Sequence, residues 1–156
     1  MVSKSKSQTQ KLASKLVKQI LKTSPEPKRG ATIIALQGNL GSGKTTFIQG
    51  FCKALGVKHG VTSPTFIIFR KHPISRFHFL DSRFSHVYHF DLYRLRKSKE
   101  ILALGFKKII NNPENIVLIE WPEVIKKFLP KNTVWIKFGH GKKQSERKID
   151  FFQKKL

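Results

Sequence analysis

The stretch that most constrains this chain lies between Gly38 and Thr46 and reads GNLGSGKTT. It fits the pattern G-x-x-x-x-G-K-[ST], the Walker A motif, which forms a loop whose backbone N–H groups wrap a phosphate. Glycine has no Cβ atom, so the glycines of the loop let its backbone turn tightly and approach an anion closely. The pattern predicts a nucleotide-phosphate site formed by Gly38, Asn39, Leu40, Gly41, Ser42, Gly43, Lys44, Thr45 and Thr46.

The flanks of this loop have the patterns that the motif requires. Residues 33–36 form an apolar run typical of a strand, and residues 47–55 have helical spacing closed by Gly56. A chance glycine-rich turn is the alternative, and these flanks argue against it. The Lys44 ammonium is expected to reach the β- and γ-phosphates and the Thr45 hydroxyl to bind Mg²⁺. We therefore predict ATP or ADP with Mg²⁺ as ligands, and the absence of an N-K-x-D sequence argues against guanine nucleotides.

Two carboxylates follow strand-like runs further along the chain. Asp91 ends the run of residues 87–91, and Glu120 follows residues 116–119, which are apolar at every position, as in a central strand covered on both faces. In an open α/β sheet, ligands and metals bind at the carboxyl ends of the strands. Either residue alone could be a surface carboxylate, but the chain has only nine acidic residues. Asp91 and Glu120 are therefore candidates for the acidic group beside Mg²⁺.

Residues 61–70 read as a polar, proline-stiffened loop followed by a strand over residues 66–70. The hydroxyls of Ser63 and Thr65 could reach a γ-phosphate, Mg²⁺ or water and act as a nucleotide-sensing switch. An ordinary turn with a capping hydroxyl is the alternative, and the composition alone favours it.

The net charge is +22, from 31 Lys and Arg against nine Asp and Glu. Such a charge makes polyanions such as RNA natural partners, although a generally lysine-rich composition explains it equally well. Residues 7–22 predict an amphipathic helix with Lys11, Lys15, Lys18 and Lys22 around it, and its modest apolar content disfavours a membrane surface. Residues 71–85 mix basic and aromatic side chains, which suits either base stacking or, as we favour, an ordinary connection.

Length and composition indicate one soluble domain of 156 residues. No apolar run approaches the roughly 18 residues of a membrane span, no signal peptide is visible, and the single Cys52 excludes an internal disulfide. These features predict a cytoplasmic protein. Cys52 is expected to be a small core residue, and the histidines lack the spacing of a zinc site.

The predicted fold is a single α/β P-loop domain over residues 30–156, with a mixed central sheet and helices on both faces. A basic amphipathic helix and connector, residues 1–29, precede it. The other expected elements are a strand at 31–37, a helix from 98 or 99 to 106 with a further turn at 107–110, and a helix at 122–129. Strands at 133–138 and 145–152 are expected to form a hairpin through residues 139–141.

Four motifs in this order resemble the TsaE family, the bacterial P-loop ATPases of threonylcarbamoyladenosine synthesis on tRNA. They are the GxxGxGKTTF run from Gly38, TSPTF from Thr62, HFDLYRL from His89 and EWP from Glu120. The resemblance covers about residues 30–152. It departs from the family at the lysine-rich first helix, the longer segment 71–85 and the very high charge.

The resemblance implies roles for individual residues. Lys44 would contact the phosphates, Thr45 would bind Mg²⁺, and Asp91 and Glu120 would be the acidic metal and water-positioning groups. Ser63 and Thr65 fall on the family's switch-like S-P-T segment, which reverses the preference for a plain turn. Trp121 would shape the nucleotide site, and Arg147 is a weaker transfer from the last strand.

The resemblance also implies slow ATP hydrolysis that partners stimulate, with a TsaB–TsaD type complex acting on tRNA. The tRNA would be contacted indirectly or through the basic surface. Two other functions stay open. A small kinase acting on a nucleoside or RNA is permitted by the loop, although no arginine-rich lid helix is visible. A non-enzymatic RNA-binding module is the second, and the intact Lys44, Thr45, Asp91 and Glu120 argue against it.

Overall fold

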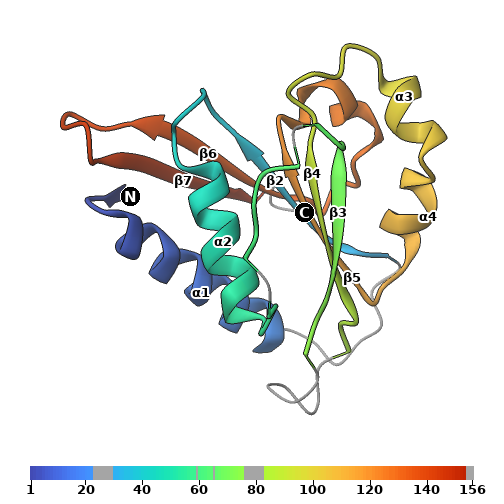
Figure 1. The fold of residues 1–156 in the computed structure, drawn as a ribbon, viewed down its shortest axis with the longest axis horizontal. Helices are drawn as coiled ribbons and strands as arrows, with labels where there is room; N and C mark the ends of the chain where they lie inside the picture. The colour runs from blue at the N-terminus through green and yellow to red at the C-terminus, as the bar shows by residue number, and fades with distance from the viewer. Residues whose placement is uncertain (23–29, 59, 65, 76–82, 154–156) are drawn as a thin grey trace.

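The computed structural model describes residues 1–22, 30–58, 60–64, 66–75 and 83–153. These residues form a mixed sheet of seven strands in the order β1-β7-β6-β2-β5-β4-β3, with helices on both faces (Figure 1). The predicted fold class is confirmed. The expected boundary near residue 29 lies outside the described residues. Within the described ranges, no helix is both long and apolar enough to cross a membrane.

The elements have the following bounds. The strands are β1 Val2–Ser3, β2 Thr32–Gln37, β3 Phe69–Pro73, β4 His86–Asp91, β5 Asn115–Glu120, β6 Val134–His140 and β7 Arg147–Gln153. The helices are α1 Lys6–Lys22, α2 Lys44–Ala54, α3 Ser98–Ala103, α4 Phe106–Asn111 and the 3₁₀ helix η2 Pro122–Phe128.

The centre of the sheet is parallel and its margins are antiparallel. Strand β2 pairs in parallel with β5 and β6, and β4 pairs in parallel with β5. Strand β3 is antiparallel to β4, β7 to β6, and β1 to β7. Every residue of β5 is buried, as the uninterrupted apolar run predicts. The carboxyl ends of β2, β4 and β5 therefore meet at one edge.

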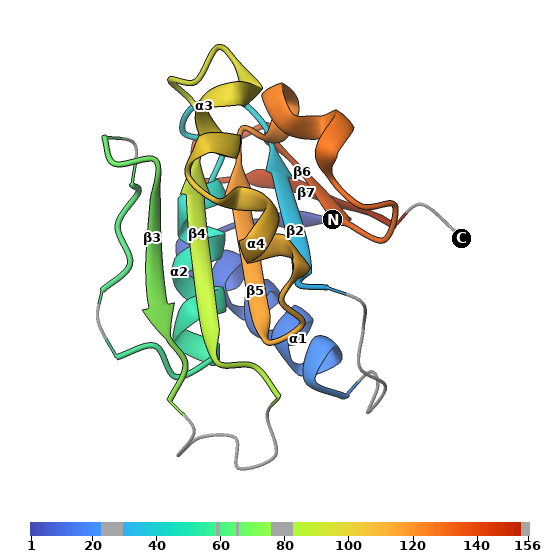
Figure 2. The same ribbon diagram turned by 90° about the vertical axis from the view of Figure 1, so that its right-hand side faces the viewer.

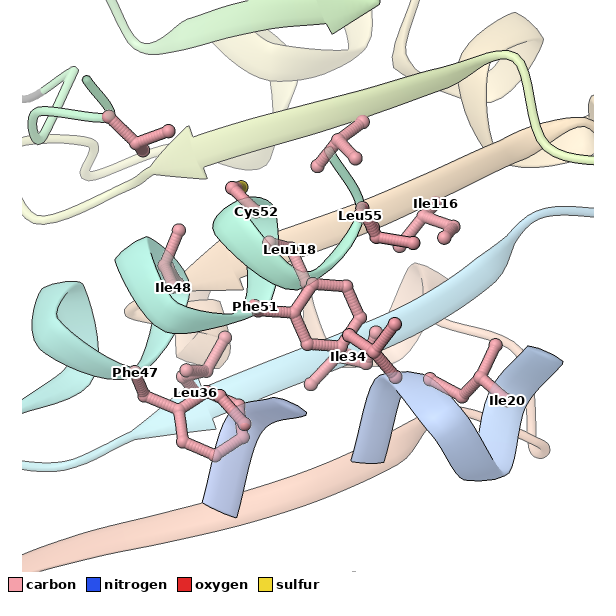
Figure 3. Close-up of a cluster of buried hydrophobic side chains, with 14 of the residues drawn as sticks. Ile20, Ile34, Leu36, Phe47, Ile48, Phe51, Cys52, Leu55, Ile116 and Leu118 are labelled. Carbon is pink, nitrogen blue, oxygen red and sulfur yellow. The ribbon is translucent and has the colours of Figure 1, made fainter. Parts of the chain in front are cut away.

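Two apolar clusters lie on opposite faces of the sheet because side chains alternate along each strand. Ile34 and Leu36 of β2 join Phe47 and Phe51 of α2 beneath α1 (Figure 3). Ile33 of β2 faces the other way, into a cluster with residues of α3, α4 and η2. Figure 2 shows α4 lying across β4 and β5 on that second face. The helices thus fix the sheet from both sides.

Helix α1 packs closely against α2, which confirms the predicted amphipathic helix. It buries Thr9, Ala13, Val17 and Ile20. The contact is close at Gly50 of α2, where an added Cβ would lie 2.5 Å from the Cα of Gln10. Glycine is costly inside a helix, so its presence here reflects the space that the close approach leaves.

The prediction of a strand over residues 66–70 is wrong at its start. Strand β3 begins at Phe69, and the preceding residues form a turn in which the Ile67 N–H donates to the Pro64 carbonyl at 2.9 Å. Ile68 has a φ of 67°, which no strand residue adopts. Phe66 is 82% exposed, so this apolar run does not mark buried sheet.

Three further boundaries differ from the sequence-based expectation. The helix expected up to residue 106 ends at Ala103, because Gly105 has a φ of 79° and starts the separate helix α4. The helix expected at 122–129 is a 3₁₀ helix. Strand β6 continues to His140, so the hairpin turn follows it instead of using residues 139–141. Strand β1 was not predicted at all.

Candidate functional site

A pocket of about 640 Å³ lies at the carboxyl edge of the parallel strands. Its walls come from the Walker A loop, the first residues of α1, the strand ends and the last hairpin. The lining residues are Lys4, Ser5, Lys6, Thr9, Leu40, Gly41, Ser42, Gly43, Lys44, Thr45, Thr46, Ser63, Asp91, Tyr93, Glu120, Trp121, Ser145 and Arg147. The structure therefore brings together most of the residues that the sequence nominated.

The loop has the shape that only glycine permits at two positions. Gly38 has a φ of 146°, and an added Cβ would lie 2.4 Å from the carbonyl oxygen of Phe138. Gly43 has a φ of 99° and immediately precedes α2. A side chain at either position would strain the backbone or collide with it. The loop thus leads directly into the amino end of a helix, where backbone N–H groups favour an anion.

Lys44 is held inside the pocket. Its ammonium donates to the carbonyl oxygens of Gly38 at 2.7 Å and Asn39 at 3.0 Å, and it lies 4.1 Å from the ring centroid of Trp121. Burial lowers the pKa of Lys44, and the nearby carboxylates of Glu120, Asp91 and Glu123 partly oppose this effect. The Lys44 ammonium is therefore hydrogen-bonded to neutral carbonyl oxygens, and an anionic phosphate oxygen can replace them as the acceptor.

Glu120 connects the sheet edge to the loop. The Thr45 hydroxyl donates to its carboxylate, with both oxygens at 3.1 Å, and His89 Nε2 lies 2.9 Å from Oε1. Glu120 is 3% exposed and His89 is fully buried. Because a carboxylate only accepts, the histidine carries its proton on Nε2. Thr45 and Glu120 are thus already adjacent, as expected of two groups that share a cation.

Asp91 lies beside Glu120 on the neighbouring strand, because β4 and β5 pair in register at these residues. Its carboxylate accepts from the Ser63 hydroxyl and, at 3.1 Å, from the backbone N–H of Tyr93. Ser63 therefore reaches the site as the switch interpretation requires. Thr65 lies outside the described residues.

Several residues at or beside the pocket were missed by sequence reasoning. His89 stands in the HFDLYRL motif but was given no role, although it contacts Glu120. Lys4, Lys6 and Thr9 precede the loop by some thirty residues and reach the pocket only through the packing of α1. No local signal could have identified them. Arg147, the weaker candidate, does reach the loop, and its Nε donates to the Gly41 carbonyl at 3.1 Å.

The donors fit a hard cation held partly by a ligand. Among the described residues, no group of three or more His, Cys, Asp or Glu side chains is close enough to hold a metal alone. One hydroxyl and two carboxylates are present in Thr45, Asp91 and Glu120, and Mg²⁺ prefers oxygen donors that include substrate phosphates. The set therefore suits Mg²⁺ that arrives with a nucleotide.

The fold and the loop define a class, an α/β protein with a Walker A loop at the end of a central parallel strand. The family model "Threonylcarbamoyl adenosine biosynthesis protein TsaE" matches residues 3–149. The chain therefore belongs to the TsaE family. The match begins within the first strand, so it includes α1.

Two relatives agree with this assignment, and one solved structure shares the fold. The chain is 40% identical over 129 residues to the tRNA threonylcarbamoyladenosine biosynthesis protein TsaE of Rickettsia conorii, which covers 80% of this chain and 62% of that protein. It is 31% identical to the protein of the same name from Bacillus subtilis, which covers 86% of this chain and 77% of that protein. The alignment thus spans about three fifths of the length of the Rickettsia relative. The crystal structure of YdiB from Bacillus subtilis matches with a TM-score of 0.68 at 24% identity. The match covers 97% of this chain and 82% of the YdiB chain, so the two share a fold.

Proposed function

We propose that this chain binds and hydrolyses ATP with Mg²⁺ in the cytoplasm, as part of threonylcarbamoyladenosine synthesis on tRNA. The observation that carries the proposal is the contact of Thr45 with Glu120 directly beside the buried ammonium of Lys44. These are the three kinds of group that P-loop enzymes use around the β- and γ-phosphates. A TsaB–TsaD type complex is the proposed partner.

Each side chain has a proposed task. The Walker A backbone and Lys44 bind the β- and γ-phosphates, and the Thr45 hydroxyl with Asp91 binds Mg²⁺. Glu120 orients water or contacts the metal through its outer shell, and Ser63 reports the state of the site to the following loop through its bond to Asp91. When bound, Mg²⁺ supplies positive charge to the transferring phosphoryl group. Trp121 and Arg147 line the pocket.

The hydrolysis is expected to be slow in the isolated chain. The Lys44 ammonium interacts electrostatically with Glu120 and Asp91, and the Arg147 guanidinium is bound to backbone carbonyls of the last hairpin. Phosphoryl transfer gains greatly from an arginine that a partner supplies. We therefore expect the partner complex to raise the rate, which would couple hydrolysis to assembly.

A magnesium titration of two variants tests the roles of the carboxylates. Asp91→Asn and Glu120→Gln each remove a charge without changing volume, so both should fold. Asp91→Asn should raise the Mg²⁺ concentration needed for half-maximal phosphate release. Glu120→Gln should lower the rate at saturating Mg²⁺. The site assignment is wrong if both variants release phosphate at the parent rate across the titration.

The kinase alternative is tested in the same assay. Adding nucleosides or RNA ends should leave the yield of free phosphate unchanged if water is the acceptor. Labelled phosphate appearing on an added acceptor would instead identify a kinase. Reconstitution with TsaB, TsaD and tRNA, with and without this chain, then tests its place in the modification.

A further inference from the structure

Four lysines form one row along the exposed side of α1. Lys11, Lys15, Lys18 and Lys22 follow one another at intervals of four, three and four residues, and all four are exposed. At 3.6 residues per turn, this spacing places them within about 60° around the helix and about 16 Å along it. We name these four residues the α1 lysine row.

The first two described segments of the chain contain no acidic residue. Residues 1–22 and 30–58 contain no Asp or Glu, and the acidic residues that the structure describes all lie at position 91 or beyond. Lysines at i and i+4 repel each other, and a surface helix commonly relieves this with an acidic neighbour. A general enrichment in lysine raises the charge everywhere, but it does not explain why the two segments that contain α1 and α2 hold no acidic residue.

The apolar side of α1 is already occupied. Ala13, Val17 and Ile20 are buried in the cluster shared with α2. Figure 1 shows α1 lying beside α2. A helix that binds a membrane surface needs its apolar side free to enter the lipid. Only the lysine side of α1 is left for a partner, so the partner should be recognised by charge.

The amino end of the same helix reaches the nucleotide pocket. Lys4 and Lys6 are exposed and line the pocket, and Lys4 lies just before the first turn of α1. Positive charge therefore occurs both at the pocket, in Lys4 and Lys6, and further along the helix, in the α1 lysine row. A long, flexible polyanion can contact both, whereas a free nucleotide occupies only the pocket.

We propose that the α1 lysine row binds the phosphate backbone of an RNA, with the bound strand running towards the nucleotide pocket. Only the choice of tRNA as the RNA rests on the proposed function; the binding of an RNA backbone does not. Lysine contacts of this type carry no sequence preference and act by releasing counterions. Four contacts would make the affinity fall on the order of 100-fold between 50 and 200 mM salt.

The test compares two variants that lose the same charge from opposite faces. K11Q/K15Q/K18Q/K22Q removes the α1 lysine row. K99Q/K107Q/K108Q/K127Q removes four exposed lysines from α3, α4 and η2 on the other side of the sheet. Binding of a labelled tRNA transcript is measured by fluorescence anisotropy across a salt series. The first variant should lose most of the affinity and reduce the slope of log Kd against log salt by about 3 to 4 units.

The control variant should keep most of the slope. Equal losses in the two variants would overturn the proposal, because net charge and not the row would then explain binding. Unchanged binding in the row variant would overturn it too, as would binding of the parent to phosphatidylserine vesicles in preference to tRNA. The melting temperature of the row variant should be no lower than that of the parent, because removing like charges relieves the repulsion between lysines along α1.

Nucleotide binding separates this proposal from the proposed function. The row variant should bind ATP and release phosphate as the parent does, because none of its four residues lines the pocket. A parent that binds tRNA through the row but never hydrolyses ATP would refute the ATPase and leave the row standing.

Discussion

Replacing Lys44 with alanine should remove tight nucleotide binding. In the free protein its ammonium already makes two hydrogen bonds, to the carbonyls of Gly38 and Asn39. Binding a nucleotide exchanges these neutral acceptors for anionic phosphate oxygens. The loss on mutation is therefore the difference between the two sets of bonds, and not the full strength of the phosphate contacts.

The size of this difference follows from the number of bonds. Hydrogen bonds of an ammonium are charge-assisted and contribute about 1.5–3 kcal/mol each; we place those to neutral carbonyls at the low end of this range and those to anionic phosphate oxygens towards the high end. The net loss for Lys44→Ala is about 1.5–3 kcal/mol, which corresponds to roughly a 10- to 150-fold increase in Kd. Lys53→Ala is the matched control, because it removes the same charge from an exposed position on α2.

The ring of Trp121 provides the assay. It lies 4.1 Å from the Lys44 ammonium, so moving that charge towards a phosphate should change the emission of this residue. Trp135 is the second tryptophan of the chain, and Trp135→Phe removes its background signal. Titration with ADP and Mg²⁺ then gives Kd for each variant. A Lys44→Ala protein that binds ADP as tightly as the parent would refute the assignment of the loop.

Three further outcomes are expected. Because burial lowers the pKa of Lys44, nucleotide affinity should fall at an alkaline pH where exposed lysines are still charged. Lys44→Arg should flatten this dependence of affinity on pH. The free protein should instead gain stability as the pH rises, because Lys44 then loses its buried charge. His89→Leu should lower the rate of hydrolysis about 10- to 100-fold by releasing Glu120, and His89→Gln, which keeps a donor, should restore part of it in steady-state assays. Gly50→Ala should lower the melting temperature measured by calorimetry by about 2–8 °C, because the clash of a Cβ 2.5 Å from the backbone of Gln10 outweighs the gain in helix propensity. An unchanged melting temperature would contradict the close packing of α1 and α2.

The sequence was informative wherever one short segment carries the whole signal. The Walker A loop, strand β2 and strand β5 could be predicted because glycine spacing and uninterrupted apolar runs have few structural solutions. Asp91 and Glu120 could be nominated because each ends such a run. Their juxtaposition then follows from the parallel pairing of β4 with β5.

What could not be predicted depends on contacts between distant segments. His89 and Glu120 lie 31 residues apart, and their bond exists only because two strands align. Strand β1 has two residues and is defined by its partner β7. At residues 66–68 the apolar pattern was misleading, because Phe66 is exposed and Ile68 turns the chain.

The position of β2 has a consequence for how the chain is made. This strand carries the Walker A loop, yet both of its neighbours, β5 and β6, come much later in the sequence. Synthesis delivers the chain from the amino end, so a nascent chain holds the complete loop while β2 still has two open edges. Arg147, on the wall of the pocket, is added last of all the lining residues. A ribosome stalled before β5 would therefore display the complete Walker A sequence on a strand that has neither of its neighbours, and we expect nucleotide binding only from the finished chain.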